Sequence, residues 1–301
     1  MSTELRISED NDGRRVDRVL RVLWPNVPLG AIMKAIRTGE VRLNGKKTKQ
    51  EARLSEGDLL QLPWNDEIRG GSVAAVHKEQ PSHKLPPLET LYRDENIWIV
   101  NKPAGLLTQP DTKDGDSLIT RALSELHWER SDYRPATVQR LDRNTSGAVI
   151  IALSGVAQRK LAELIRLHKI RKFYRAVVEG EPQPEGRIEL ALLKESETNT
   201  VKADRNGQPA LTLYKTLSRG TAKSVVEAEL VTGRPHQARV HLAAIGCPIV
   251  GDTKYGTGRG AKRPLLHAER LIFPDDPSLP KALRGRTITA PLPSDMEKYC
   301  R

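Results

Sequence analysis

A carboxylate flanked by two arginines is the first arrangement in this sequence that could do chemistry. Asp142 lies between Arg140 and Arg143, in a polar segment that leads into the apolar stretch 148–153. Cations on either side can keep a carboxylate charged or bring a phosphate to it. The Thr-Ser-Gly sequence at 145–147 predicts a tight turn into a buried strand. Because an aspartate beside arginine is more often a structural ion pair, this stretch alone makes Asp142 only a candidate.

Two later segments carry polar groups that are further candidates for the site, and in the second of them packing does not explain the density of polar groups. Tyr174 alternates with apolar neighbours in a predicted strand, where a tyrosine usually belongs to the core with its hydroxyl bonded. Residues 230–242 place Arg234, Arg239 and two histidines in a short stretch beside an apolar helix start. No third residue of suitable type lies near these histidines, so we expect no metal site.

The amino-terminal part has the pattern of a small basic domain over residues 14–63. Val16, Val19, Leu20 and Leu23 lie at helical spacing and predict a helix that ends before Pro25. A second helix is predicted from roughly Leu29 to Thr38. Strands are predicted at 41–43 and 58–62, with an Asn-Gly turn after the first. Lysine and arginine side chains are spread over all of these elements.

Residues 64–87 have the character of a linker, and residues 88–301 that of a second domain. The linker is rich in proline, glycine and charged residues without sustained periodicity. Strands and helices then alternate to the end of the chain. They predict an α+β domain with a large, mainly antiparallel sheet flanked by helices and a central cleft. The predicted elements are strands at 97–100, 173–178, 211–216 and 224–230 and helices at 117–126 and 156–168.

Composition favours a polyanionic partner. The chain has 301 residues, with 49 Lys and Arg against 38 Asp and Glu, a formal net charge of +11 that suits nucleic acid. Aromatic residues make up only 4%, which argues against a broad base-stacking surface. Cys247 and Cys300 stand alone, so neither a disulfide framework nor a zinc site is expected. The first residues lack the pattern of a targeting signal, and we expect a cytoplasmic protein.

Three motifs, in this order, resemble those of the RluA family of pseudouridine synthases. Residues 140–147 match its Arg-Leu-Asp-x-x-Thr-Ser-Gly motif, residues 172–174 its Lys-x-Tyr, and residues 232–242 its Thr-Gly-Arg-x-His-Gln-x-Arg-x-His-Leu. The resemblance implies that Asp142 is the catalytic aspartate and that Arg239 pairs with it. It also implies that Tyr174 packs on the target base and helps to move a proton.

The same resemblance implies the reaction and its substrate class. Enzymes of this family isomerise uridine in RNA, without a cofactor, after flipping it out of the helix, and the counterpart of Arg140 fills the gap. Residues 14–63 resemble the RNA-binding module of ribosomal protein S-four, which favours large-subunit ribosomal RNA as substrate. We expect the protein to be a monomer. The residues expected to bind RNA are Lys34, Arg37, Lys46, Lys47, Arg140, Arg143 and Arg234.

Some features depart from the family pattern or leave alternatives open. Gln139 stands where the family commonly has histidine, and Thr108-Gln109-Pro110 replaces a usual His-Pro. Residues 246–256 are expected to build the wall of the site. A non-enzymatic RNA-binding or ribosome-assembly factor and an enzyme acting on transfer RNA are the competing interpretations. A glycosidase would need a second facing carboxylate, which the motifs do not offer. Whether Asp142 attacks covalently or removes a ribose proton stays open.

Overall fold

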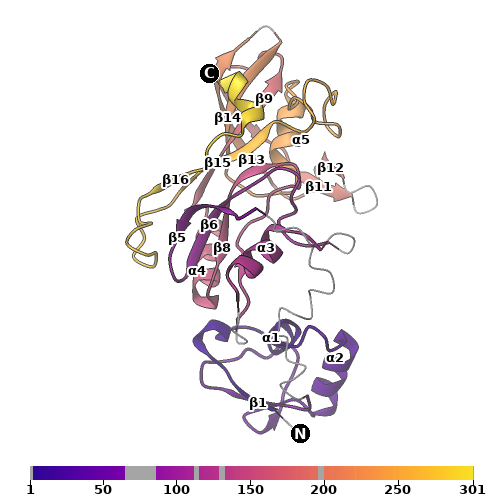
Figure 1. Cartoon of the computed structure of the whole chain (residues 1–301). Coiled ribbons are helices and arrows are strands. Elements are labelled where there is room, and N and C mark those ends of the chain that lie inside the picture. Colours follow the sequence, from indigo (N-terminus) through magenta and orange to yellow (C-terminus); the bar gives the residue numbers. More distant parts are fainter. Residues whose placement is uncertain are drawn as a thin grey trace.

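The computed structural model describes residues 3–64, 86–111, 115–128, 133–195, 200–220 and 222–300. The predicted linker therefore lies almost entirely outside the described residues. The described chain forms an N-terminal unit, residues 3–64, and a larger C-terminal unit, residues 86–300, as Figure 1 shows. Among the residues described, no helix is long and apolar enough to cross a membrane.

The N-terminal unit combines two helices with a small antiparallel sheet of strand order β1-β4-β2-β3. Helix α1 buries the apolar side chains at 16, 19, 20 and 23, as the periodicity predicts. Helix α2 ends at Gly39, whose φ of 84° closes the helix in the left-handed region that glycine adopts readily. Strand β1, which pairs with β4, was not predicted from the sequence. The elements are β1 Thr3–Arg6, the 3-10 helix η1 Glu9–Asn11, α1 Val16–Leu23, α2 Leu29–Thr38, β2 Arg42–Leu43, β3 Lys46–Lys47 and β4 Leu59–Leu62.

The C-terminal unit is built on a ten-stranded sheet, which confirms the predicted α+β class. Its main order is β10-β13-β14-β9-β15-β8-β6-β5, with β7 paired to β8 and β16 to β15. Only the pairing of β15 with β8 is parallel among the described strands of this sheet. The strands are β5 Glu89–Arg93, β6 Ile97–Lys102, β7 Ala136–Thr137, β8 Ser146–Ala152, β9 Arg171–Glu179, β10 Glu185–Glu189, β13 Leu211–Arg219, β14 Lys223–Leu230, β15 Leu266–Ile272 and β16 Thr287–Thr289.

A short separate hairpin and further helices complete this unit. Helix α3 begins with a capping box at Ser117, whose side chain accepts from the Thr120 amide while the Thr120 hydroxyl accepts from the Ser117 amide. The remaining elements are the hairpin β11 Leu192–Glu195 and β12 Thr200–Ala203 and the helices α3 Leu118–Glu125, α4 Gly155–Arg166, α5 Gln237–Ala244 and α6 Ser294–Cys300.

Strand β8 is the centre of the core. All seven of its residues are buried, because the sheet has an apolar cluster on each face. Val149 and Ile151 pack into one cluster together with α3 and Tyr174, whereas Ile150 packs into the other with α4 and Phe273. Because β8 packs into both clusters, the point at which the chain enters this strand, after residue 145, has a fixed position.

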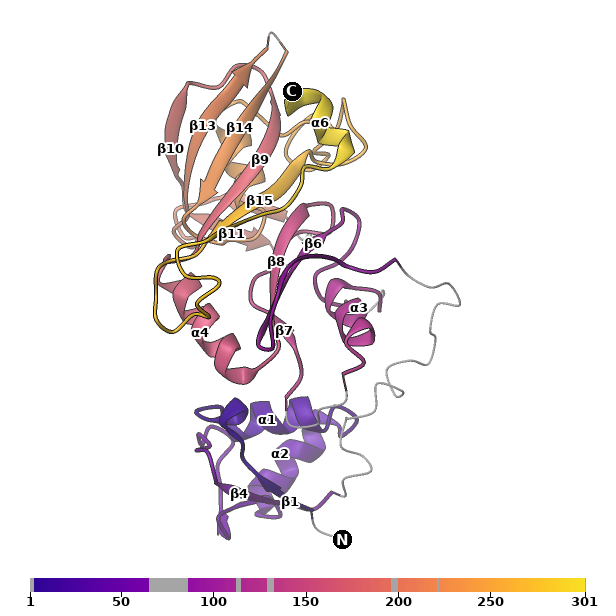
Figure 2. The ribbon, with the colours of Figure 1, turned by 60° about the vertical axis from the view of Figure 1, so that its left-hand side comes forward.

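The two units contact each other at the start of α4. The carboxylate of Asp10 accepts a 2.6 Å hydrogen bond from the Gly155 amide, and Arg159 donates to the carbonyl oxygens of Asp10 and Glu9 at 3.0 and 2.9 Å. Asp10 thereby serves one of the amides that a helix start leaves without an intrahelical partner. Figure 2 shows the N-terminal unit lying against the end of α4. A Cβ atom at Gly155 would lie 2.0 Å from the carbonyl oxygen of Asp10, so the contact requires glycine.

We expect Gly155→Ala to separate the two units. The added methyl group collides with Asp10 backbone atoms, and overpacking of this kind costs about 1–3 kcal/mol. Chemical denaturation should show a lower free energy of unfolding, and small-angle scattering a larger radius of gyration. Gly30→Ala is the matched control, because Gly30 also lies in a first helical turn but a methyl group added there would meet no atom within 4 Å. Equal behaviour of the two variants would contradict the contact.

Candidate active site

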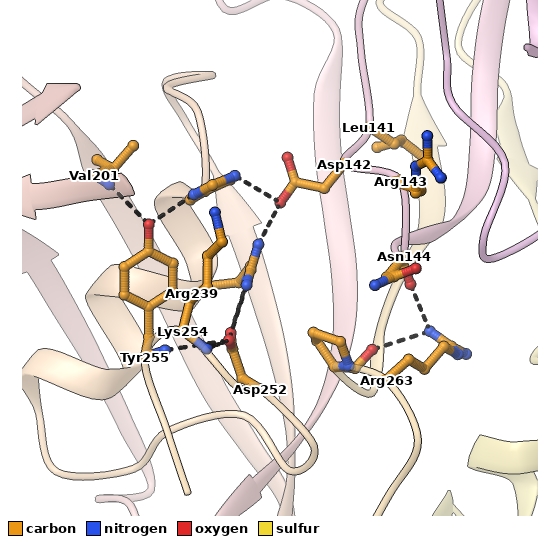
Figure 3. A network of polar contacts seen from close by, with 12 residues as sticks. Leu141, Asp142, Arg143, Asn144, Val201, Arg239, Asp252, Lys254, Tyr255 and Arg263 are labelled. Atoms are coloured by element: carbon orange, nitrogen blue, oxygen red, sulfur yellow. Dashed lines mark hydrogen bonds and ion pairs between the residues drawn. The ribbon is translucent and has the colours of Figure 1, made fainter. Parts of the chain in front are cut away.

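Asp142 and Arg239 meet between the loop that precedes β8 and helix α5. The Nη1 atom of Arg239 donates to Oδ2 of Asp142 at 3.2 Å. The Asp142 side chain is 30% exposed, whereas that of Arg239 is 9% exposed. Figure 3 shows the carboxylate and the guanidinium directed at each other. A partly open carboxylate supported by a buried cation can act on a molecule that arrives from solvent.

Asp252 holds Arg239 from the other side. Its two oxygens accept from Nε and Nη2 of Arg239 at 2.7 and 2.8 Å, and Asp252 is fully buried. Burial alone would raise the pKa of Asp252, but the hydrogen bonds from Arg239 and from the amides of Lys254 and Tyr255 outweigh it and lower the pKa. This bidentate pairing fixes the guanidinium plane and leaves Nη1 for Asp142.

The backbone on both sides of Asp142 is clamped. The hydroxyl of Thr108 donates to the carbonyl oxygen of Leu141 at 2.7 Å and accepts from its amide at 3.0 Å. On the other side, Nη1 of Arg263 donates to the carbonyl oxygen of Asn144 at 3.1 Å (Figure 3). Arg263 is itself held by two hydrogen bonds to Asp295 in α6, of 2.7 and 2.8 Å. The loop therefore presents the Asp142 side chain from a fixed backbone.

Lys102 adds a third clamp from the end of β6. Its buried ammonium donates to the carbonyl oxygens of Arg143, Leu106 and Pro103 at 3.1, 2.7 and 2.9 Å. Burial lowers the pKa of Lys102 to about 7, although the charge of Asp142 acts in the opposite direction. The three carbonyl acceptors also favour the charged form, because a neutral amine has only two protons to donate. Lys102 thus joins the turn after β6 to the loop of Asp142.

Tyr174 lies on β9 near the same carboxylate. Burial raises the pKa of its hydroxyl, and the charge of Asp142 raises it further. The side chain is 8% exposed, and no hydrogen bond to its hydroxyl is present among the described residues. A phenol with a raised pKa stays protonated at neutral pH, so it can donate a proton or rest against a base but does not act as a ready anion.

The residues predicted to bind RNA fall into separate groups. Arg140 and Arg143 are exposed beside Asp142, and Arg143 lies 4.0 Å from the carboxylate of Asp111. The Nε atom of Arg234 donates to the carbonyl oxygen of Pro209 at 3.0 Å. On the N-terminal unit, the exposed residues Lys34, Arg37 and Lys47 line a groove of about 560 Å³, with exposed Lys46 next in sequence to Lys47.

Several supporting residues could not be recognised from the sequence. Residues 246–256 were expected only to build the wall of the site, yet Asp252 in this segment anchors Arg239. Thr108 stood out only as a departure from a family pattern, and Lys102 and Arg263 received no role. The one local signal was an Asp inside a Gly-Asp-Thr-Lys-Tyr-Gly turn. Within the described residues, no group of three or more His, Cys, Asp or Glu could hold a metal ion.

The sequence around this site matches a family of known proteins. The family model of RNA pseudouridylate synthases matches residues 96–244, a span that includes Asp142, Tyr174 and Arg239. The chain is 34% identical to ribosomal large subunit pseudouridine synthase C of Vibrio parahaemolyticus, over 97% of this chain and 93% of the relative. It is 32% identical to ribosomal large subunit pseudouridine synthase D of Xylella fastidiosa, over 98% of this chain and 90% of the relative.

Two solved human structures have a fold similar to that of this chain. The structure titled human RNA pseudouridylate synthase domain containing 4 is 26% identical, with a TM-score of 0.56, and the match covers 70% of this chain and 93% of the human one. A second human structure, of domain containing 1, is 25% identical with a TM-score of 0.55, over 71% of this chain and 94% of the human one. The similarity therefore extends to the fold of the larger unit.

The clamp on Leu141 can be tested by Thr108→Val. This change keeps the shape of the side chain but leaves the buried amide and carbonyl of Leu141 unpaired, at about 1–3 kcal/mol for each group. We expect a lower free energy of unfolding and faster hydrogen exchange at the amides of the 141–144 loop. Thr108→Ser, which keeps the hydroxyl, is the control and should stay close to wild type. Identical exchange in the two variants would show that the hydroxyl does not hold the loop.

Proposed function

Because this chain belongs to the RNA pseudouridylate synthase family, we propose that it isomerises uridine to pseudouridine in RNA, with large-subunit ribosomal RNA as its substrate. The observation that carries the proposal is the Asp142 carboxylate, which Arg239 supports and a clamped loop presents to solvent. The relatives named as ribosomal large subunit synthases align with nearly the whole chain, including the N-terminal unit. A role limited to RNA binding is not favoured, because these relatives are named as enzymes.

The proposed reaction is an isomerisation that exchanges the C–N bond between ribose and uracil for a C–C bond. The bond from ribose to uracil nitrogen breaks, the base turns, and a bond to carbon forms, so substrate and product have the same atoms and no cofactor or metal is needed. Flipping the uridine out of a helix costs a few kcal/mol. In our proposal, exposed Arg140 fills the gap in the helix. Asp142 acts on the flipped nucleotide, and protonated Tyr174 rests on the base and helps to move its proton.

The N-terminal unit supports the choice of a structured RNA as substrate. We propose that residues 14–63 form an RNA-binding module, that 64–87 link it to the enzyme domain at 88–301, and that Lys34, Arg37, Lys46 and Lys47 bind phosphates. Arg143 and Arg234 bind phosphates nearer the site. Contacts of this kind add affinity without reading sequence. We also propose that the protein works in the cytoplasm, where a ribosomal RNA substrate is made in bacteria such as those of the relatives, and that it works as a monomer.

The activity is tested by replacing Asp142 in the cell and in vitro. A strain lacking the gene should lose discrete pseudouridine signals in large-subunit ribosomal RNA when its RNA is mapped by carbodiimide-stop sequencing. The wild-type gene should restore them and Asp142→Asn should not, because an amide cannot act as a carboxylate. We expect the purified variant to keep its fold and RNA affinity while its rate falls by at least about a thousandfold, the scale of a lost nucleophile or base.

Asp116→Asn is the matched control for this experiment. Asp116 pairs with Arg121 at the start of α3, so this variant changes a carboxylate that is not part of the Asp142–Arg239 pair and should restore the signals fully. If signals were lost only from transfer RNA, the proposed reaction would stand but the proposed substrate would be wrong. Restoration of the ribosomal signals by Asp142→Asn would overturn the proposed chemistry.

The basic groove is tested by Lys46→Glu combined with Lys47→Glu. Both side chains are exposed, so the fold should be unaffected. We expect RNA affinity to fall by about tenfold or more. The slope of log affinity against log salt should also decrease by about 0.7–0.9 for each lost phosphate contact. Lys281→Glu with Lys298→Glu changes the net charge equally at exposed sites elsewhere and should bind almost as wild type. If both double variants lost the same RNA affinity, the loss would come from net charge alone and not from the groove.

A further inference from the structure

His236 has a conformation and a set of neighbours that the proposed reaction does not yet use. It precedes α5 in the left-handed region, with φ 52°, which is uncommon for a residue other than glycine. Its Nδ1 atom lies 2.7 Å from the hydroxyl oxygen of Tyr255, and its Nε2 atom lies 3.9 Å from Oδ2 of Asp142. Backbone conformations of this kind persist where the surroundings hold them, often at functional sites.

The hydrogen bonds around Tyr255 favour one position for the ring proton of His236. The hydroxyl oxygen of Tyr255 accepts from the amide of Val201 at 2.9 Å, as Figure 3 shows. The hydroxyl has one proton of its own, and Nδ1 of His236 is the acceptor within reach. A proton on Nδ1 would leave the Tyr255 hydroxyl proton without a hydrogen-bond acceptor among the described residues. The arrangement therefore favours the tautomer with its ring proton on Nε2, the atom that faces Asp142.

The ring of His236 is also uncharged. Burial lowers the pKa of His236, and the nearby cations Arg239 and Lys254 lower it as well, against the opposing effect of Asp142 and Asp252. The imidazole at neutral pH is therefore a neutral ring with one N–H. Its interaction with Asp142 depends on direction: Nε2–H attracts the carboxylate, whereas a lone pair on Nε2 would repel it.

We propose that His236 is a positioning residue for Asp142, whose Nε2–H, oriented by Tyr255, shares Oδ2 with Arg239 and leaves Oδ1 to act on uridine. Among the described residues, no hydrogen bond reaches Oδ1. The inference rests on the proposed function and goes further, because it assigns the two oxygens different tasks. At 3.9 Å the Nε2–H is beyond hydrogen-bond range, and contacts of this kind shorten when a substrate completes the site.

The proton position can be measured directly by NMR of protein with ¹⁵N-labelled histidine, with His236→Gln used to identify the signals of His236. In wild-type protein we expect Nε2 to be the protonated nitrogen. In Tyr255→Phe, which keeps the ring near Arg239 but removes the hydroxyl, we expect a mixture of the two forms. If the role of Tyr255 were purely structural, the protonated nitrogen of His236 would be the same in Tyr255→Phe as in the wild type. Protonation at Nδ1 in the wild type would overturn the inference.

Single-turnover kinetics at saturating RNA test the consequence for the reaction. We expect Tyr255→Phe to lower the rate about tenfold with RNA affinity unchanged, which indicates an interaction used only during reaction. His236→Gln, whose amide can still donate towards Oδ2, should remain within a few-fold of wild type, whereas His236→Leu should lose about tenfold or more. Tyr92→Phe, which removes a hydroxyl bonded to Asp94 away from the site, is the control and should be unaffected.

These results separate the inference from the proposed function. Wild-type rates in Tyr255→Phe and His236→Leu would overturn the inference and leave the activity intact. Absence of pseudouridine with wild-type protein would overturn the proposed function and the inference with it.

Discussion

The arrangement depends on one guanidinium shared by two carboxylates. Burying an arginine and an aspartate is costly unless their charges and hydrogen-bonding groups are satisfied together. Arg239 and Asp252 meet this condition through two parallel hydrogen bonds, and the third side of the guanidinium is left for Asp142. Asp142 thus receives a cation whose position is set by a fully buried partner. Because Asp252 fixes the position of Arg239, the more exposed carboxylate of Asp142 is free to act on a substrate.

A second level of support acts through the backbone. Side chains from distant parts of the sequence, Lys102, Thr108 and Arg263, bond to peptide groups of the loop around Asp142. The loop then runs into β8, which is buried on both faces. Rigid placement of this kind is what a site needs if the reacting atom is to stay within a fraction of an ångström of its target. This requirement explains why several buried polar side chains support the partly exposed carboxylate of Asp142.

The sequence predicted elements with a strong local pattern, and it missed those defined by distant contacts. Helix α1 ends before Pro25 and α2 runs from Leu29 to Thr38, both as predicted, because apolar spacing and the glycine at 39 mark them locally. Strand β1 was missed, since four residues with two buried positions give little periodicity.

The same division holds in the site. Asp142, Tyr174 and Arg239 stood out through motif order, and the structure brings Arg239 against Asp142. Their roles in catalysis remain predictions. The support from Asp252 and Thr108 has no local signature, because each meets its partner only after the chain has folded. The Asp10 contact to Gly155 joins residues 145 positions apart in the same way.

The parallel pairing of β8 with β15 in the large sheet has a consequence for how the protein is made. Ser146 of β8 lies beside His267 of β15, 121 positions later, and Arg263 reaches back 119 positions to Asn144. Contacts this distant in sequence close slowly, because the entropy of a long loop must be lost first. The support around Asp142 can therefore be completed only after residues 263–268 have been synthesised, so the N-terminal unit can fold well before the site is assembled.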